Sequence, residues 1–327
     1  MAGSVKLNAP LGGSVTLNAV NTSVNYVMSV PAAAGVLINA DSATGAAQLP
    51  VGTTGQRPAS PVTGQLRFNS TLGISEVYNG TAWVSVGGSY TVDILAIGGG
   101  GAGGANGGSF GSGAGGGAGG MLPIANSIAV VPTIAFAVVV GAGAASNTST
   151  GGASGSPSSV FTWSAAGGGG GGGPNGNGVA GGSGGGAGGG SVTNVGGAGN
   201  TPSTTPSQGN NGGVGVQTST PGGGGGAGAA GGASSTGGAG LSNSYSGSAV
   251  TYAKGGDGNV GSPVSGTANT GNGGDGRAQS VGSSGAGGSG IVIIRYLGTV
   301  ARGTGGTITI VGNYVIHTFT TSGTFTA

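Results

Sequence analysis

The start of the chain alternates apolar and polar residues in two closely similar segments. Ser4–Ala9 reads Ser-Val-Lys-Leu-Asn-Ala, and Ser14–Ala19 reads Ser-Val-Thr-Leu-Asn-Ala after a pair of glycines. Such alternation is typical of strands with one buried face, so both segments are predicted to be β-strands. Two short strands cannot bury a hydrophobic core within one chain. We therefore expect them to stack along a fibre or across subunits.

A second alternating region lies between residues 65 and 86. The pattern predicts a β-hairpin module in which Asn79-Gly80 forms a two-residue type I′ turn between strands. Tyr78 and Trp83 are its expected apolar anchors, and the module is too small to be stable without a partner surface. The polar, proline-containing stretch at 41–64 is predicted to be a linker.

Beyond residue 90, short apolar segments alternate with runs of glycine. The segments are rich in β-branched residues, which favours buried strands. They are Thr91–Ile97, Ile128–Val131, Ile134–Val140, Val160–Trp163, Ala249–Ala253 and Ile291–Tyr296. The stretch at 121–140 is long enough for a membrane helix, but Pro132 and its β-branched residues favour two buried strands. We expect a chain that is not membrane-embedded.

Glycine changes this picture most. The chain has 88 glycines, and 70 of the 193 residues from 98 to 290 are glycine. A glycine in a regular element loses roughly 0.5–1 kcal/mol more backbone freedom than alanine. The region is therefore either disordered or packed so closely that side chains would not fit. Disordered segments usually combine low hydrophobicity with high charge, and this chain is only 4% charged.

Two familiar glycine-rich architectures do not match the pattern. Collagen needs glycine at every third residue, and runs such as Gly167–Gly173 break that period. Flexible linkers would not need an apolar strand at each return. Extended helices of the polyproline II type have no internal hydrogen bonds, so packed glycine runs could satisfy one another's backbone groups. We predict such a polyglycine II lattice, with disorder as the alternative.

The charged residues are few and scattered. Seven cations and five carboxylates are spread over 327 residues. Nucleic-acid binding needs clustered Lys and Arg, so no nucleic-acid partner is expected. An uncharged chain that stayed unfolded would aggregate, which favours folding as an oligomer.

The sequence offers little for catalysis. It has no cysteine, and His317 is its only histidine, which we expect to face solvent or a subunit contact. A zinc site would need further nitrogen or thiolate ligands. The glycines at 98–101 follow a strand, but no helical pattern follows them as a dinucleotide site requires. We predict that the protein is not an enzyme and has no catalytic residue, metal site or cofactor.

Several segments resemble proteins of tailed bacteriophages. Gly64–Ser70 with Val77–Trp83 resembles a β-module of tail-fibre proteins, and the N-terminal repeat resembles their shafts. Val92–Ile97 entering glycines, with Gly288–Tyr296 at the other end, resembles the phage glycine-rich domain. The tail from Ile316 is similar to a segment that usually precedes that domain, so its position after the domain is a departure.

The resemblance implies a mainly β chain with packed polyglycine II helices, assembled as a homotrimeric fibre. The expected parts are a shaft or attachment segment at 1–40, a linker at 41–64, a hairpin module at 65–89, the glycine-rich domain at 90–297 and a β tail at 298–327. It implies a structural protein on the virion surface that joins other virion proteins through its N-terminal region. The alternative is a capsid-associated head fibre or decoration spike.

Loops between glycine runs are the expected recognition surface. Related phage adhesins contact the host receptor through loops at the end of such a lattice, and loops on a rigid scaffold are the usual binding surfaces. The partner would be a host surface glycan or an outer-membrane protein; the alternative is that these are ordinary solvated turns. The candidate residues are Asn175, Asn177, Asn200, Asn210, Asn211, Tyr245, Asn259 and Asn272.

Overall fold

The structure is a computed structural model that divides into two units, Met1–Val51 and Gly52–Ala327. It describes residues 4–8, 14–18, 40–41, 46–47, 49–71, 73–86, 89–106, 110–148, 151–217, 220–279 and 282–327. The described residues contain strands and one short 3-10 helix but no α-helix, which confirms the expected mainly β class.

The repeated segments near the N-terminus pair with each other. β1 (Ser4–Asn8) and β2 (Ser14–Asn18) are antiparallel, with Val5 opposite Leu17 and Leu7 opposite Val15. A second short pair joins β3 (Ala40–Asp41) to β4 (Ala46–Ala47). The two predicted strands are thus confirmed, and they pair within one chain; stacking along a fibre stays a prediction.

The hairpin module is a four-stranded sheet in the order β5-β6-β7-β8. Its elements are β5 (Val51–Gly52), the 3-10 helix η1 (Thr54–Gln56), β6 (Leu66–Asn69), β7 (Ile74–Tyr78) and β8 (Trp83–Ser85). Tyr78 pairs with Trp83, so the turn has four residues, and the predicted two-residue type I′ turn is wrong. The side-chain oxygen of Asn79 holds this wider turn by accepting from the N–H groups of Thr81 and Ala82.

The module is built around buried polar side chains. Arg67, Asn69 and Glu76 are buried, while the expected anchors Tyr78 and Trp83 are only half-buried. Arg57 forms a 2.6 Å ion pair with the Glu76 carboxylate and lowers its pKa. Arg57 belongs to the stretch expected to be a linker, so that stretch is part of the module from β5 onward. A buried ion pair leaves no apolar pattern by which sequence could reveal it.

The glycine-rich part contains a five-stranded antiparallel sheet in the order β10-β9-β16-β18-β17. Its strands are β9 (Tyr90–Ile97), β10 (Met121–Val130), β16 (Ile291–Leu297), β17 (Thr307–Val311) and β18 (Tyr314–Phe319). β9 and β16 lie inside the sheet and are buried on both faces, which explains their continuous apolar runs. The predicted strands at 91–97 and 291–296 are confirmed.

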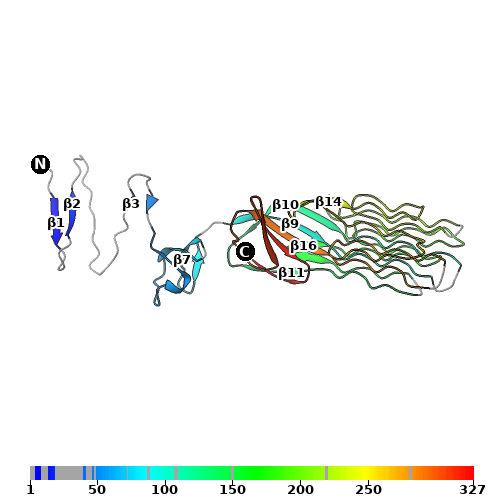
Figure 1. The fold of residues 1–327 in the computed structure, drawn as a ribbon, viewed down its shortest axis with the longest axis horizontal. Helices are drawn as coiled ribbons and strands as arrows, with labels where there is room; N and C mark the ends of the chain where they lie inside the picture. The colour runs from blue at the N-terminus through cyan, green and yellow to red at the C-terminus, as the bar shows by residue number, and fades with distance from the viewer. Residues whose placement is uncertain are drawn as a thin grey trace. The chain divides into compact units, whose positions relative to one another are not determined.

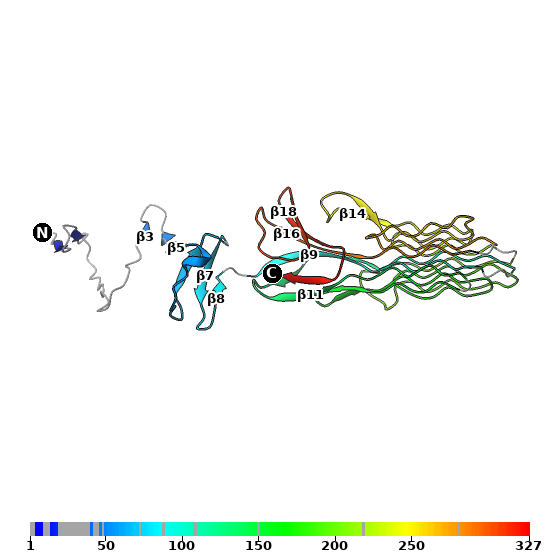
Figure 2. The same cartoon turned by 60° about the horizontal axis from the view of Figure 1, so that its bottom comes forward.

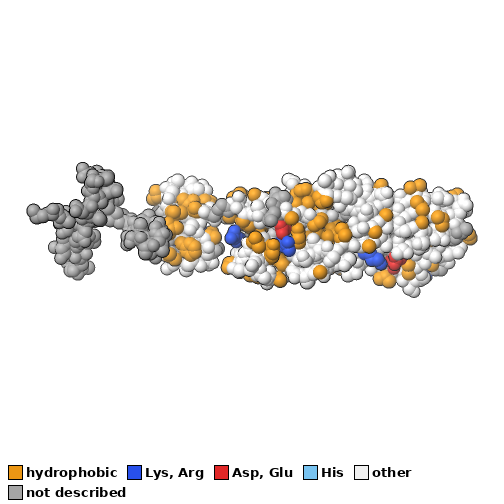
Figure 3. Space-filling view, turned by 90° about the horizontal axis from the view of Figure 1, so that it is seen from above, with side chains coloured by type: hydrophobic (Ala, Val, Ile, Leu, Met, Phe, Trp, Pro, Cys, Tyr) orange, Lys and Arg blue, Asp and Glu red, His pale blue; other side chains and the backbone are white. Residues whose placement is uncertain are grey.

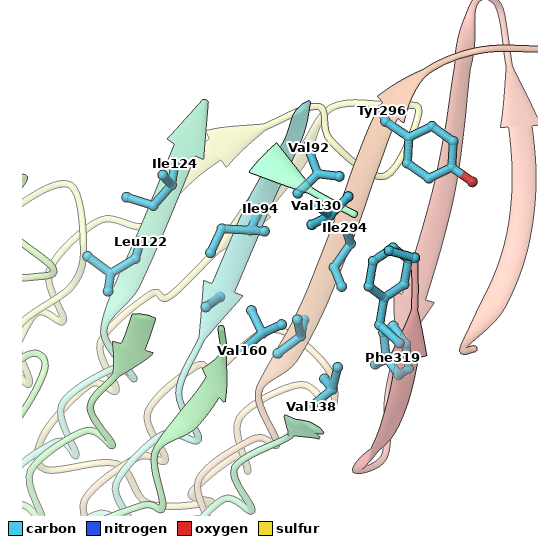
Figure 4. Close-up of a cluster of buried hydrophobic side chains, with 14 of the residues drawn as sticks. Val92, Ile94, Leu122, Ile124, Val130, Val138, Val160, Ile294, Tyr296 and Phe319 are labelled. Carbon is cyan, nitrogen blue, oxygen red and sulfur yellow. The ribbon is translucent and has the colours of Figure 1, made fainter. Parts of the chain in front are cut away.

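A four-stranded antiparallel sheet in the order β13-β12-β11-β19 packs against the first sheet. Its strands are β11 (Ala135–Val139), β12 (Ser158–Val160), β13 (Trp163–Ala165) and β19 (Gly323–Thr326). Buried side chains such as Ile94, Ile294, Val138 and Val160 fill the space between the two sheets (Figures 2 and 4). The tail after residue 298 therefore supplies strands to both sheets.

Two strand predictions need correction in this sheet. The segment at 160–163 is not one strand, because Phe161 turns with φ +54° between β12 and β13. Most of β11 lies at the surface, since only Val138 is buried, so the second strand predicted within 121–140 is not a buried one.

The outer face of the five-stranded sheet is covered by a hairpin. β14 (Leu241–Asn243) pairs with β15 (Val250–Tyr252), and Tyr252 packs with Leu95, Ile293 and Ile316. The sequence indicated β15 but not β14, because three residues with one apolar member carry no strand pattern.

Beyond the strand ends, the glycine runs lie side by side as a glycine array (Figure 1). Successive N–H groups of the run at 98–104 donate to three neighbouring runs in turn, at 114–120, 153–156 and 285–288, and the order of neighbours repeats every third residue. The run at 112–120 donates to 166–172, 222–225 and 271–277, and accepts from 98–104, 183–189 and 256–259. Its backbone is thus hydrogen-bonded on all sides.

Close packing explains why these positions are glycine. A Cβ on Gly116 would overlap the carbonyl oxygen of Gly101, and one on Gly170 would overlap that of Gly152. Any side chain there would push two backbones apart and break their hydrogen bonds.

Candidate functional site

The glycine array has two ends. The run at 98–106 leaves β9 and the run at 111–120 returns to β10; likewise the run at 141–147 leaves β11 and the run at 151–157 returns to β12. One end of the array is therefore joined to the sheets. The turns between outgoing and returning runs lie at the opposite end, which we call the far end.

The far-end turns lie next to one another. Backbone pairs join Asn106 to Gly282, Gly190 to Gln217, Asn194 to Gly215 and Val260 to Arg277. The described residues of these turns are 106, 110–111, 147–148, 174–177, 190–195, 214–217, 259–264, 277–279 and 282–283. They form one continuous surface, held in place by the array behind it.

This surface exposes large apolar side chains. Phe110 is 63% exposed, Val195 64% and Val264 66%, and Val214 is also exposed beside the Asn194–Gly215 pair. Apolar side chains are visible among uncharged polar ones at the end farthest from the grey atoms (Figure 3). Sequence analysis missed these residues; the available signal was a single large apolar residue inside a glycine-rich turn. Exposed apolar groups in loops mark interaction surfaces.

The eight predicted recognition residues do not lie together. Asn175, Asn177 and Asn259 are in far-end turns. The other five lie toward the sheets: Asn200, Asn210, Asn211, Tyr245 and Asn272. The loop at 200–208, for example, ends where the Gln208 carbonyl accepts from the N–H of Met121 at the start of β10. Which end a turn occupies depends on the direction of each run, and composition carries no such information.

Most of these asparagines bind neighbouring backbone. The side-chain oxygens of Asn175, Asn177, Asn211 and Asn272 each accept from an N–H of an adjacent run, at 2.8–2.9 Å. Asp257 and Asp275 do the same. Surface runs lack a neighbour on one side, so side-chain oxygens replace the missing carbonyls.

The remaining three asparagines have different roles. Asn200 accepts from the N–H groups of Thr204 and Gln208 and so shapes its own loop. Asn210 donates from its side chain to the carbonyls of Gly226 and Ala227. Asn259 turns the chain with φ +54° while its N–H donates to Gly113.

Tyr245 packs against the five-stranded sheet. The Arg295 guanidinium lies 3.8 Å from the centre of the Tyr245 ring and 4.4 Å from that of Tyr314. The same arginine forms a 2.9 Å ion pair with Asp93. Burial raises the pKa of Tyr245, so its hydroxyl stays protonated at neutral pH. This tyrosine covers a charge pair on the sheet.

His317 is buried, so the expectation that it faces solvent or a subunit contact is wrong. It lies in the core between the sheets, where one ring nitrogen, Nδ1, is 2.8 Å from the Gly305 carbonyl and the other, Nε2, is 3.2 Å from the Tyr296 hydroxyl. That hydroxyl accepts from the Arg302 N–H, so its own hydrogen points to Nε2 and Nδ1 carries the ring proton. Burial lowers the pKa of His317.

Within the described residues, no group of three or more His, Cys, Asp or Glu side chains could hold a metal ion. None of the helices found there has the length and apolar character needed to cross a bilayer.

A family described as a glycine-rich domain matches residues 75–297, which include the whole glycine array and both of its central strands. The chain belongs to this glycine-rich domain family. Neither a curated protein nor a solved structure matches it. Membership in the glycine-rich domain family confirms the coarser half of the sequence resemblance, and assignment to a phage tail fibre stays a prediction.

Proposed function

We propose that this glycine-rich domain protein is a structural fibre protein of a tailed-phage virion and that its far-end turns contact the host receptor. The observation that carries the proposal is the exposed apolar surface of Phe110, Val195 and Val264 on turns fixed by a hydrogen-bonded array. A rigid scaffold that presents loops is a common solution for recognition. Of the asparagines predicted from sequence, Asn175, Asn177 and Asn259 are placed to take part.

The chemistry of the surface favours an uncharged partner. Apolar side chains gain most by burial against another apolar surface, and asparagine amides can donate to carbonyl or hydroxyl oxygens. An exposed loop of an outer-membrane protein supplies both. A neutral host glycan is the other outcome that the adsorption experiment below can return.

We further propose that the runs are polyglycine II helices and that the fibre is a homotrimer. Hydrogen bonds that change neighbour with a three-residue period support the first point. The small size of the β1–β2 pair supports the second, because its apolar residues need a partner surface. The N-terminal region would then join other virion proteins. Light scattering should give a mass of three chains; a stable folded monomer would refute the trimer.

Host adsorption tests the role of the far end. A variant carrying Phe110→Ser, Val195→Ser and Val264→Ser should adsorb poorly while melting like the wild type. The matched control is Val131→Ser, Ile134→Ser and Val300→Ser, which removes three exposed apolar residues from the sheet part. Equal adsorption by the two triple variants would contradict receptor binding by the far end.

Position on the particle separates the tail fibre from its alternative. A density map of intact virions should place this protein on the tail, with the glycine array pointing outward. Density on the capsid would favour a head fibre or decoration spike. As a protein proposed not to be an enzyme, it should release no reducing sugar or peptide from host envelopes.

A further inference from the structure

A cavity of about 380 Å³ opens where two strands of the five-stranded sheet separate. β9 and β16 pair from Ile97–Ile291 to Asp93–Arg295, and pairing ends there although the strands continue to Tyr90 and Leu297. Side chains from both diverging strands line the space, together with Arg302 and Tyr314. The cavity therefore has a specific cause in the register of the sheet.

The cavity carries one positive charge that no carboxylate balances. Arg295 is paired with Asp93 at 2.9 Å and lies against the Tyr314 ring. Arg302 lies over the Tyr90 ring at 5.5 Å and has no carboxylate partner among the described residues. A small anion would complete the charge balance here.

Tyr90 adds an unused hydrogen-bond donor. It is only 9% exposed, and its hydroxyl has no hydrogen-bond partner in the described part of the chain. The Tyr296 hydroxyl on the neighbouring strand differs, because it is bonded to His317 and to the Arg302 N–H. A buried polar group without a partner costs about 1–3 kcal/mol. Burial raises the pKa of Tyr90, so the phenol remains a donor at neutral pH.

We propose that this cavity binds the carboxylate of a small sugar acid. The Tyr90 hydroxyl donates to one carboxylate oxygen and the Arg302 guanidinium pairs with the other. The rings of Tyr296 and Tyr314 line the remaining space and offer faces to the sugar ring. The volume lies within the usual range of ligand sites, about 300–1,000 Å³. Because the cavity is at the sheet end of the array, this inference does not depend on receptor binding at the far end.

Calorimetric titration of the full chain with glucuronate tests the site. Tyr90→Phe and Arg302→Gln should each weaken binding about tenfold, as expected for the loss of a hydrogen bond to a charged group. Lys254→Gln, which removes an exposed cation outside the cavity, should leave binding unchanged. Tyr90→Phe should melt no lower than the wild type, because it removes an unsatisfied hydroxyl; this controls for misfolding.

Two further probes identify the ligand chemistry. Glucose should bind much more weakly than glucuronate if the carboxylate is recognised, and acetate should bind more weakly if the sugar ring contributes. Glucose equal to glucuronate would overturn the carboxylate assignment, and acetate equal to glucuronate would overturn the sugar. Absence of glucuronate binding at millimolar concentration, or binding unaffected by both cavity variants, would overturn the site itself.

Discussion

The two-sheet part and the glycine array of this molecule are stabilised in opposite ways. Between the sheets, side chains such as Ile94, Ile294 and Phe325 fill the interior, and their removal from water provides the stability. In the array, the backbones of neighbouring runs meet directly, and a Cβ at Gly116 would overlap a carbonyl. Hydrogen bonds and close backbone contact replace side-chain burial there.

The comparison shows how a featureless glycine run acquires a register. Ile97 pairs with Met121 in the sheet, and Gly98 then bonds to Gly120 and Gly101 to Gly117, so the antiparallel offset of β9 and β10 continues into the array. The offset of β9 and β16 likewise continues from the Ile97–Ile291 pair into the bond from Gly100 to Gly288. The strands thus supply positional information that glycine cannot carry.

Removing a core side chain should give the largest effect. Phe325→Ala creates a cavity between the sheets, where Phe325 contacts the rings of Phe161 and His317. We expect a loss of about 3–5 kcal/mol in the free energy of unfolding, measured by urea denaturation. The control is Phe110→Ala at an exposed turn, which should change stability by less than about 0.5 kcal/mol. Equal effects would mean that the sheets do not form the core described.

Adding one methyl group to the array should give the next largest effect. Gly116→Ala places a Cβ against backbone and should lower stability by about 1–3 kcal/mol. Gly261→Ala makes the same chemical change where nothing lies within 4 Å. It should be neutral or stabilise by up to about 1 kcal/mol through the unfolded state. Thermal melting of both variants tests this contrast, and similar tolerance at the two sites would favour flexible runs.

The buried histidine should make the sheets sensitive to mild acid. Because burial lowers the pKa of His317, the unfolded chain binds the proton more readily than the folded chain. Stability is then fully present above the unfolded pKa of about 6.5 and falls as the pH drops through the folded value, by at most about 1.4 kcal/mol per pH unit. His317→Gln should remove this slope between pH 7.5 and 5.5. A slope that survives in the variant would assign it to another group.

Loss of a surface cap should give the smallest effect. Asn211→Ala removes the oxygen that accepts from the Gly199 N–H at 2.8 Å and should lower stability by about 0.5–1.5 kcal/mol. Asn211→Asp retains an acceptor oxygen and should keep wild-type stability. If Asn211→Ala instead leaves the melting temperature unchanged but impairs adsorption, this residue acts in recognition as the sequence predicted.

The sequence revealed elements whose evidence is local. β9 and β16 were evident because both faces are buried and their residues are uniformly apolar. Order in the glycine runs followed from low charge and from the strands that flank them. Membership in the glycine-rich domain family agrees with that interpretation.

Features that depend on distant pairing were not accessible in the same way. β18 joins β16, and β19 joins β11 across most of the chain, so the tail could not be assigned to the sheets from its own residues. His317 alternates with apolar neighbours in β18, but only the second sheet makes its face an interior one. The split of the predicted asparagines between two ends likewise follows from run directions that glycine does not encode.

Amide hydrogen exchange tests the central claim, that the glycine runs form an ordered hydrogen-bonded array, most directly. Selective ¹⁵N labelling of alanine reports on buried array amides at Ala102, Ala114 and Ala118, whose N–H groups donate to neighbouring runs. Ala96 in β9 and Ala233 in an exposed turn are internal references. The array amides should be protected to about the same degree as Ala96. Exchange as fast as that of Ala233 would contradict the ordered array.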